Sequence, residues 1–129
     1  MTLDDLSEAD ILNLKAGPEL DALVEVHVMG REVICDRHGC YWVKGDHGLL
    51  GNNPPKPYST DGNAMLEAWH RLRALGWMVE LVQRPDQDMC RIILRYLTDG
   101  SIRAVIRAEA GSLPHAVALA ALLAMKKGG

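Results

Sequence analysis

The segment 35–47 gathers two cysteines and two histidines, and thiolate and imidazole groups are the usual ligands of protein-bound zinc. Cys35, His38, Cys40 and His47 follow the spacing C-x2-H-x-C-x6-H, whereas structural zinc sites present a close pair of ligands and a second pair farther along the chain. If Cys35 and Cys40 lie on the two strands of a hairpin, they can face opposite sides of it. The spacing favours a hairpin with polar turn histidines, and a metal site on these four residues is the alternative.

A second group of reactive side chain types lies at positions 58–61, in Tyr58, Ser59, Thr60 and Asp61. Ser59 and Asp61 together with His70 have the residue types of a serine hydrolase, but the chain has neither a G-x-S-x-G nucleophile elbow nor a phosphate-binding loop. The same hydroxyls and carboxylate are suited to cap the helix that follows. A helix start preceded by a Gly/Pro-rich loop can also seat a carboxylate or phosphate, so we expect these four residues to border a ligand site and assign no catalytic residue.

Four arginines form the third group, with Arg91 and Arg95 on one predicted strand and Arg103 and Arg107 on the next. A three-residue turn at 98–100 would pair Arg95 with Arg103 and Arg91 with Arg107, placing all four on one face and the apolar residues on the other. A two-residue turn would pair Arg95 with position 104 and mix the two faces. We predict the first register.

Four unpaired guanidinium groups cannot be buried against an apolar helix, so this face requires a negative counterpart or solvent. Glu80 on the preceding strand can neutralise one of them. The other three arginines can be satisfied in four ways: by water, by the acidic N-terminal part, by a second subunit, or by an anionic ligand held by bidentate contacts.

Apolar periodicity and turn residues predict the elements that position these groups. The first helix starts near Thr2, the second has Pro18 at its first position, and Asp61 is among three possible caps of the third. The predicted helices cover about 3–14, 18–29, 61–75 and 113–127, and the predicted strands cover 31–37, 40–44, 77–84, 89–97 and 101–108.

The resulting order, ααββαβββα, predicts an α+β fold over residues 1–129 as a single domain, with one mostly antiparallel sheet of about five strands and helices on both of its faces. The expected core residues are apolar and occupy the inward positions of these elements. They are Leu20, Leu23, Val24, Met65, Trp69, Leu72, Val79, Leu81, Ile92, Leu94, Ile106, Leu119 and Leu122.

Several segments resemble the phage ABA sandwich domain family. They are Ala16-Gly17-Pro18-Glu19-Leu20-Asp21-Ala22-Leu23-Val24, Val28-Met29-Gly30, Pro57-Tyr58-Ser59-Thr60-Asp61 with Ala64 to Trp69, Gly76-Trp77, and the closing helix Leu113 to Ala124. The resemblance spans most of the chain and implies a small α/β/α sandwich encoded by a phage or prophage, without an assigned biochemical activity. It gives no role to the histidines and cysteines of residues 31–50.

Composition bounds the class of protein. The chain has 129 residues, 48% of them hydrophobic and 24% charged, and it has no apolar run long enough to span a membrane. The acidic start lacks the basic region of a secretion signal, and three cysteines argue against a disulfide scaffold. We therefore expect a cytoplasmic protein, and the resemblance implies that the cytoplasm is that of a bacterial host.

The net charge is −3, but it is unevenly distributed, with nine acids and two bases in residues 1–36 and seven arginines and four acids in residues 71–107. Residues 61–127 share the αβββα order of double-stranded RNA-binding domains, yet the start of the last helix has no basic side chain, which argues against nucleic acid. The last helix is apolar on nearly every side, which predicts either deep burial or a homo-oligomer.

These observations predict a non-enzymatic phage or prophage accessory protein that needs no cofactor and binds a host protein or a small anionic, nucleotide-like ligand. The ligand site would include residues 58–61 and the four arginines. The alternative is a small metal-dependent hydrolase or nuclease that uses Cys35, Asp36, His38 and His47.

Overall fold

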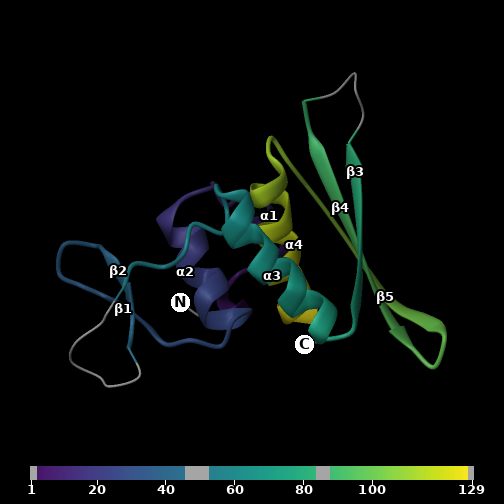
Figure 1. The fold of residues 1–129 in the computed structure, drawn as a ribbon, viewed down its shortest axis with the longest axis horizontal. Helices are drawn as coiled ribbons and strands as arrows, with labels where there is room; N and C mark the ends of the chain where they lie inside the picture. The colour runs from purple at the N-terminus through teal and green to yellow at the C-terminus, as the bar shows by residue number, and fades with distance from the viewer. Residues whose placement is uncertain (1–2, 46–52, 84–87, 128–129) are drawn as a thin grey trace.

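The computed structural model describes residues 3–45, 53–83 and 88–127 of the chain, which contain four α-helices and five strands (Figure 1). The α+β class predicted from the sequence is confirmed. The first predicted helix is divided into a short 3-10 helix and α1. In chain order the elements are η1 (Leu3–Asp5), α1 (Glu8–Leu12), α2 (Pro18–His27), β1 (Val33–Cys35), β2 (Tyr41–Val43), α3 (Gly62–Ala74), β3 (Trp77–Gln83), β4 (Cys90–Thr98), β5 (Ser101–Ala110) and α4 (Leu113–Lys127).

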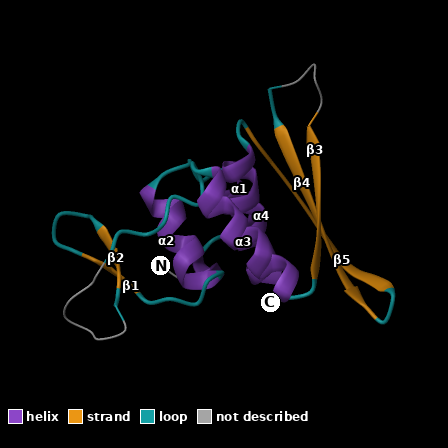
Figure 2. Cartoon of the chain, in the orientation of Figure 1, coloured by secondary structure: helices purple, strands orange, loops and turns teal. Residues whose placement is uncertain are grey.

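The five strands form two antiparallel sheets, β1-β2 and β3-β4-β5, and not the single sheet expected from the sequence. The β1–β2 hairpin packs on α2, while α3 and α4 pack against the three-stranded sheet. Figure 2 shows the hairpin and the larger sheet on opposite sides of the helices. The hairpin strands have three residues each and are already packed on a helix, so they do not extend the larger sheet.

Helix α4 is the centre of the core. It contacts α1, α2 and α3 as well as β4 and β5, and every residue from Ala116 to Ala124 is buried. These contacts cover its apolar circumference within one chain, so the apolar character of α4 does not itself require a second copy. None of the described helices has the length and hydropathy that crossing a bilayer requires.

Ten of the expected core residues are buried, and Trp69 and Val79 pack against the core while partly exposed. Leu81 is the exception, because its side chain is 41% exposed. It alternates with Trp77 and Val79 along the inner face of β3, but it lies toward the end of the strand that extends past the helices in Figure 1.

The predicted register of β4 and β5 is wrong by two residues. Thr98 pairs with Ser101 across a two-residue turn in which Asp99 and Gly100 have positive φ, and a bulge follows between positions 96 and 97. Arg95 therefore pairs with Val105, and Arg91 pairs with Glu109. Because the side chain period of a strand is two, this shift of two residues leaves positions 104–110 on their predicted faces. Between the turn and the bulge the shift is one residue, so Ile102, which pairs with Leu97 and is 56% exposed, does not lie on its predicted face.

Candidate functional site

The loop before α3 is fixed to α2 by a buried carboxylate. Oδ1 of Asp21 accepts hydrogen bonds from the backbone N–H of Ser59 at 2.8 Å and from its hydroxyl at 2.7 Å. The Ser59 oxygen in turn accepts a bond of 2.9 Å from the N–H of Gly17, the residue that precedes α2. Burial raises the pKa of Asp21 above its ordinary value, against the effect of the Ser59 hydrogen bonds, which lower it.

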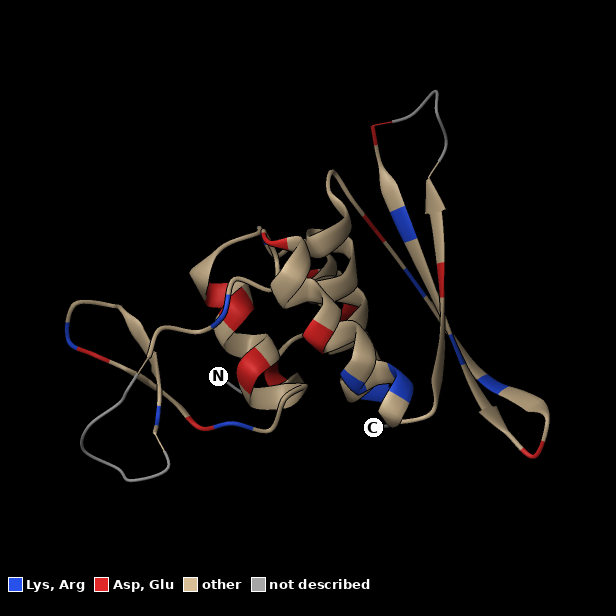
Figure 3. Ribbon diagram, viewed as in Figure 1, with Lys and Arg blue, Asp and Glu red and all other residues tan. Residues whose placement is uncertain are grey.

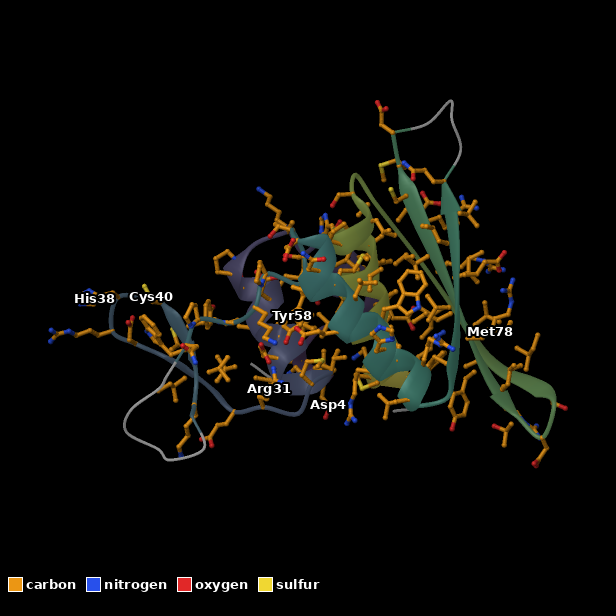
Figure 4. All side chains as sticks on the ribbon, in the orientation of Figure 1. Asp4, Arg31, His38, Cys40, Tyr58 and Met78 are labelled. Carbon is orange, nitrogen blue, oxygen red and sulfur yellow. The ribbon has the colours of Figure 1, made fainter. Side chains whose placement is uncertain are left out.

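A second buried carboxylate lies one turn farther along α2. Oε1 of Glu25 accepts a bond of 2.7 Å from the Tyr58 hydroxyl, and Oε2 lies 3.1 Å from a guanidinium nitrogen of Arg31. The N–H of Lys56 also points to Oε1, at 3.3 Å. Burial, together with the hydrogen bond to Glu25, raises the pKa of the Tyr58 phenol well above its usual range. Figure 4 shows Tyr58 and Arg31 beside α2.

At positions 58, 59 and 61 the polar side chains form hydrogen bonds within the protein, which accounts for their residue types without a ligand. The hydroxyls of Tyr58 and Ser59 are buried and already donate to carboxylates of α2. Asp61 caps α3, because its Oδ2 accepts a bond of 3.3 Å from the N–H of Ala64. Thr60 and Asp61 are the exposed members of the group. The predicted ligand residues therefore hold the loop in place, and a ligand at this position would have to compete for hydroxyls that are already bonded.

The β1–β2 hairpin is organised by Asp36. Its Oδ1 accepts from the N–H groups of His38 at 2.8 Å and Cys40 at 2.9 Å, and its Oδ2 accepts from the Trp42 indole at 2.9 Å. These bonds, that from Trp42 foremost, lower the pKa of Asp36. The carboxylate thus closes the turn and at the same time orients the Trp42 ring.

The proposed metal ligands lie around this turn. Cys35, His38 and Cys40 are exposed, and Figure 4 shows His38 and Cys40 at the tip of the hairpin. His47 falls outside the described residues. In the described ranges no three His, Cys, Asp or Glu side chains are grouped closely enough to hold a metal ion.

Two grooves flank the hairpin where it meets α2, and Tyr41 borders both. The first has a volume of about 350 Å³ and is mainly apolar. Its walls are Pro18, Asp21, Gly39, Cys40, Tyr41, Trp42, Pro54 and Pro55. The second, of about 420 Å³, is lined by residues of α2 and β1 that include Glu19, His27 and Cys35.

The four arginines lie elsewhere, on the larger sheet, and Arg91, Arg95 and Arg107 are on its face that points away from the helices. Arg91 and Arg95 form ion pairs with Glu109 and Glu80. Arg107 lies on this face and is exposed, and Arg103 is exposed at the bulge. Figure 3 shows basic residues along these strands and acidic residues on α2, and Figure 4 places Met78 of β3 across the helices from Tyr58. The arginines and residues 58–61 therefore do not form one site.

The buried carboxylates Asp21 and Glu25 and the indole of Trp42 were not among the residues predicted to form a site. One signal could have identified the carboxylates: Asp21 and Glu25 are spaced four residues apart and directly follow Leu20 and Val24 of the apolar stripe, so they border the buried face of α2. The groove had no comparable signal, because it depends on the docking of the hairpin onto α2.

Comparison with known proteins gives no relative for this arrangement: no protein-family model matches the chain, and neither the curated proteins nor the solved structures provide a significant match.

Proposed function

We propose that this chain is a non-enzymatic binding protein that holds a proline-containing, extended segment of another protein in the groove beside Trp42. The observation that supports the proposal is the lining of that groove by two aromatic rings and three prolines. Flat aromatic and proline surfaces of this kind receive segments in the polyproline II conformation, whose backbone is already extended before binding.

The framework around the groove is held in place from both sides. Asp36 fixes the indole of Trp42, and the bonds between Asp21 and Ser59 fix the segment before α3 to α2, which carries Pro18. A groove that is ordered before binding loses less conformational entropy when a segment enters. This arrangement suits a binding site better than a site for bond breaking, for which no nucleophile and base are paired among the described side chains of the groove.

The charge of the two grooves favours a neutral or basic segment. Among the described residues, the carboxyl groups that line them are Asp21 in the first and Glu19 in the second, and no described lysine or arginine lines either groove. A negative ligand would meet like charge there. Of the two partner classes expected from the sequence, a host protein is therefore better supported at this site than a small anion.

Selection from a displayed library of random peptides tests the proposal. The purified chain is expected to enrich peptides that combine proline with lysine or arginine. Synthetic versions should bind with at least tenfold lower affinity to the variant Trp42→Ala, since the largest wall of the groove is removed. Arg103→Glu, at the bulge of the far sheet, is the control and should bind like the wild type. Equal binding by Trp42→Ala, or no enrichment, would overturn the proposal.

The prophage origin, the bacterial cytoplasmic location and membership of the phage ABA sandwich family remain predictions from the resemblance and the composition. The three-layer sandwich that the resemblance implies needs a layer on the outer face of β3-β4-β5. In the alternative function, a hydrolase or nuclease would hold its metal on Cys35, Asp36, His38 and His47. Metal analysis of the purified protein tests it: bound zinc or manganese, with a lower melting temperature after chelation, would favour that alternative.

A further inference from the structure

The outer face of the larger sheet has a regular arrangement of apolar and charged side chains. Helices α3 and α4 pack on the inner face, where β4 and β5 place their buried residues. The residues that alternate with these point outward and form three rows across β3, β4 and β5. The rows are Met78-Arg95-Val105, Glu80-Ile93-Arg107 and Val82-Arg91-Glu109, and we call these nine residues the outer sheet face.

The outer sheet face combines an apolar centre with both signs of charge. Ile93 lies in the middle, and Met78 at one corner is 48% exposed. Arg95 is paired with Glu80 and Arg91 with Glu109, whereas no acidic side chain in the described part of the chain forms an ion pair with Arg107. Methionine and arginine are enriched in protein interfaces, and an unpaired arginine on such a face provides a site for a partner carboxylate.

We infer that the outer sheet face binds the same face of a second copy of this chain, with the two-fold axis parallel to β4. Rotation about that axis places β3 of one copy over β5 of the other and keeps each row opposite the same row. Glu80 then faces the Arg107 of the second copy, and this ion pair occurs twice.

The remaining positions are compatible with this axis. Met78 lies opposite Val105 of the second copy, again twice, and the two Ile93 side chains meet at the centre. Arg91 and Arg95 lie opposite their own counterparts, but each has a carboxylate alongside it in its own chain, in Glu109 and Glu80. The dimer would place two sheets face to face between two layers of helices.

The other two-fold axis in the plane of the sheet runs across the strands, and charge excludes it. That rotation places Glu80 opposite Glu80 and Arg107 opposite Arg107, so both central charges meet their own sign. The alternation of side chains along β3, β4 and β5 therefore selects one of the two face-to-face arrangements.

The size of the face sets the expected affinity. Strands of seven to ten residues, at about 3.3 Å per residue and about 5 Å apart, give a face of a few hundred Å². Two such faces bury on the order of 1,000 Å² together, which is the range of weak and transient complexes. We expect a reversible dimer with a dissociation constant in the micromolar range.

Sedimentation equilibrium of the full chain, from below to above micromolar concentration, tests the dimer. The wild type should pass from the mass of one chain to twice that mass. Arg107→Glu should remain a monomer throughout, because two carboxylates then meet at each end of the central row. Glu80→Arg should also remain a monomer, because two guanidinium groups meet. Arg37→Glu, at the hairpin, makes the same charge change away from the outer sheet face and should dimerise like the wild type.

Mixing the two charge variants distinguishes this interface from any other. A chain with Arg107→Glu and a chain with Glu80→Arg have complementary central rows, so the equimolar mixture should recover dimer while neither variant dimerises alone. Circular dichroism and thermal melting establish that each variant is folded. A wild type that is monomeric at the highest concentration, a dimer that persists in Arg107→Glu, or a mixture of folded variants that stays monomeric would each overturn the inference.

Discussion

The phenol of Tyr58 donates a hydrogen bond of 2.7 Å to Oε1 of Glu25, and both residues are about 1% exposed. The bond joins α2 to the loop before α3 across 33 positions of sequence. A carboxylate at this depth is tolerated because donors surround it, namely the phenol, Arg31 and the N–H of Lys56. The bond therefore fixes the position of the loop that carries two of the groove prolines.

Removal of the Tyr58 hydroxyl tests this relationship. Tyr58→Phe keeps the ring but takes a donor from a buried carboxylate, so the free energy of unfolding should fall by about 1–3 kcal/mol. Urea denaturation measures the change. Tyr41→Phe, at a more exposed ring of the hairpin, is the control and should change stability by less than about 0.5 kcal/mol. Equal effects of the two substitutions would contradict the role assigned to the buried bond.

The contribution of Asp21 to stability should decrease as the pH rises. Its pKa in the folded chain is raised above the ordinary value of 3.8, so the folded state binds the proton more tightly than the unfolded state does. The stabilisation is complete below pH 3.8, the ordinary pKa, and it is lost as the pH rises through the higher pKa of the folded state. Relative to Asp21→Asn, the wild type should therefore lose stability from acid toward neutral pH.

Asp10 provides a control of opposite sign for that measurement. Its pKa is lowered, first by the hydrogen bond from the backbone of Ser7, with which it forms a capping box. The stability that Asp10 contributes is present above pH 3.8, the ordinary pKa, and it is lost as the pH falls through the lower pKa of the folded state. The difference between wild type and Asp10→Asn should thus grow with pH, and two curves of the same sign would disprove the assignment for Asp21.

Acid should loosen the hairpin through Asp36. Its pKa is lowered from 3.8 by hydrogen bonds that only the charged form accepts fully, so the order they provide is present above 3.8 and is lost as the pH falls through the folded value. The indole N–H of Trp42 reports this directly in NMR, by faster exchange with solvent and a change in chemical shift. Asp36→Asn should show the loosened state at neutral pH. The buried Trp77 indole should not follow the same titration.

The turn between β4 and β5 requires glycine at position 100. Gly100 has a φ of +79°, and a side chain there would meet no neighbouring atom, so the cost of Gly100→Ala is that of the backbone conformation alone, about 1 kcal/mol. Gly62→Ala is the matched control, because this glycine lies in the first turn of α3 with open space around it and no positive φ. That substitution should be neutral or stabilising by up to about 1 kcal/mol. Denaturation curves that rank the two variants in the reverse order would refute the turn assignment.

Local sequence patterns predicted most of the elements. The apolar spacing that ends before Gly76 predicted α3, and the separation of arginine from isoleucine and leucine predicted the two faces of β4 and β5. Both patterns depend on short-range periodicity, which a single strand or helix already expresses. The register was missed because a two-residue turn followed by a bulge has nearly the same sequence as a three-residue turn.

Long-range docking could not be predicted in the same way. Nothing in residues 33–43 shows that this hairpin packs on α2 and not on β3, and so the groove beside Trp42 was not foreseen. The sequence pattern placed Tyr58 and Ser59 at a ligand site, because their partners Glu25 and Asp21 lie more than thirty residues earlier in the chain. Buried polar pairs of this kind become visible only once the elements are in contact.

The central place of α4 has a consequence for synthesis of the protein. Residues 116–124 fill the space between the other helices and the larger sheet, yet they are translated after all of them. While α4 is still inside the ribosomal exit tunnel, the apolar sides of α2 and α3 have emerged without the surface that covers them. Stable folding must therefore wait for release of residues 113–127, and chaperones that bind exposed apolar segments meet the nascent chain during that interval.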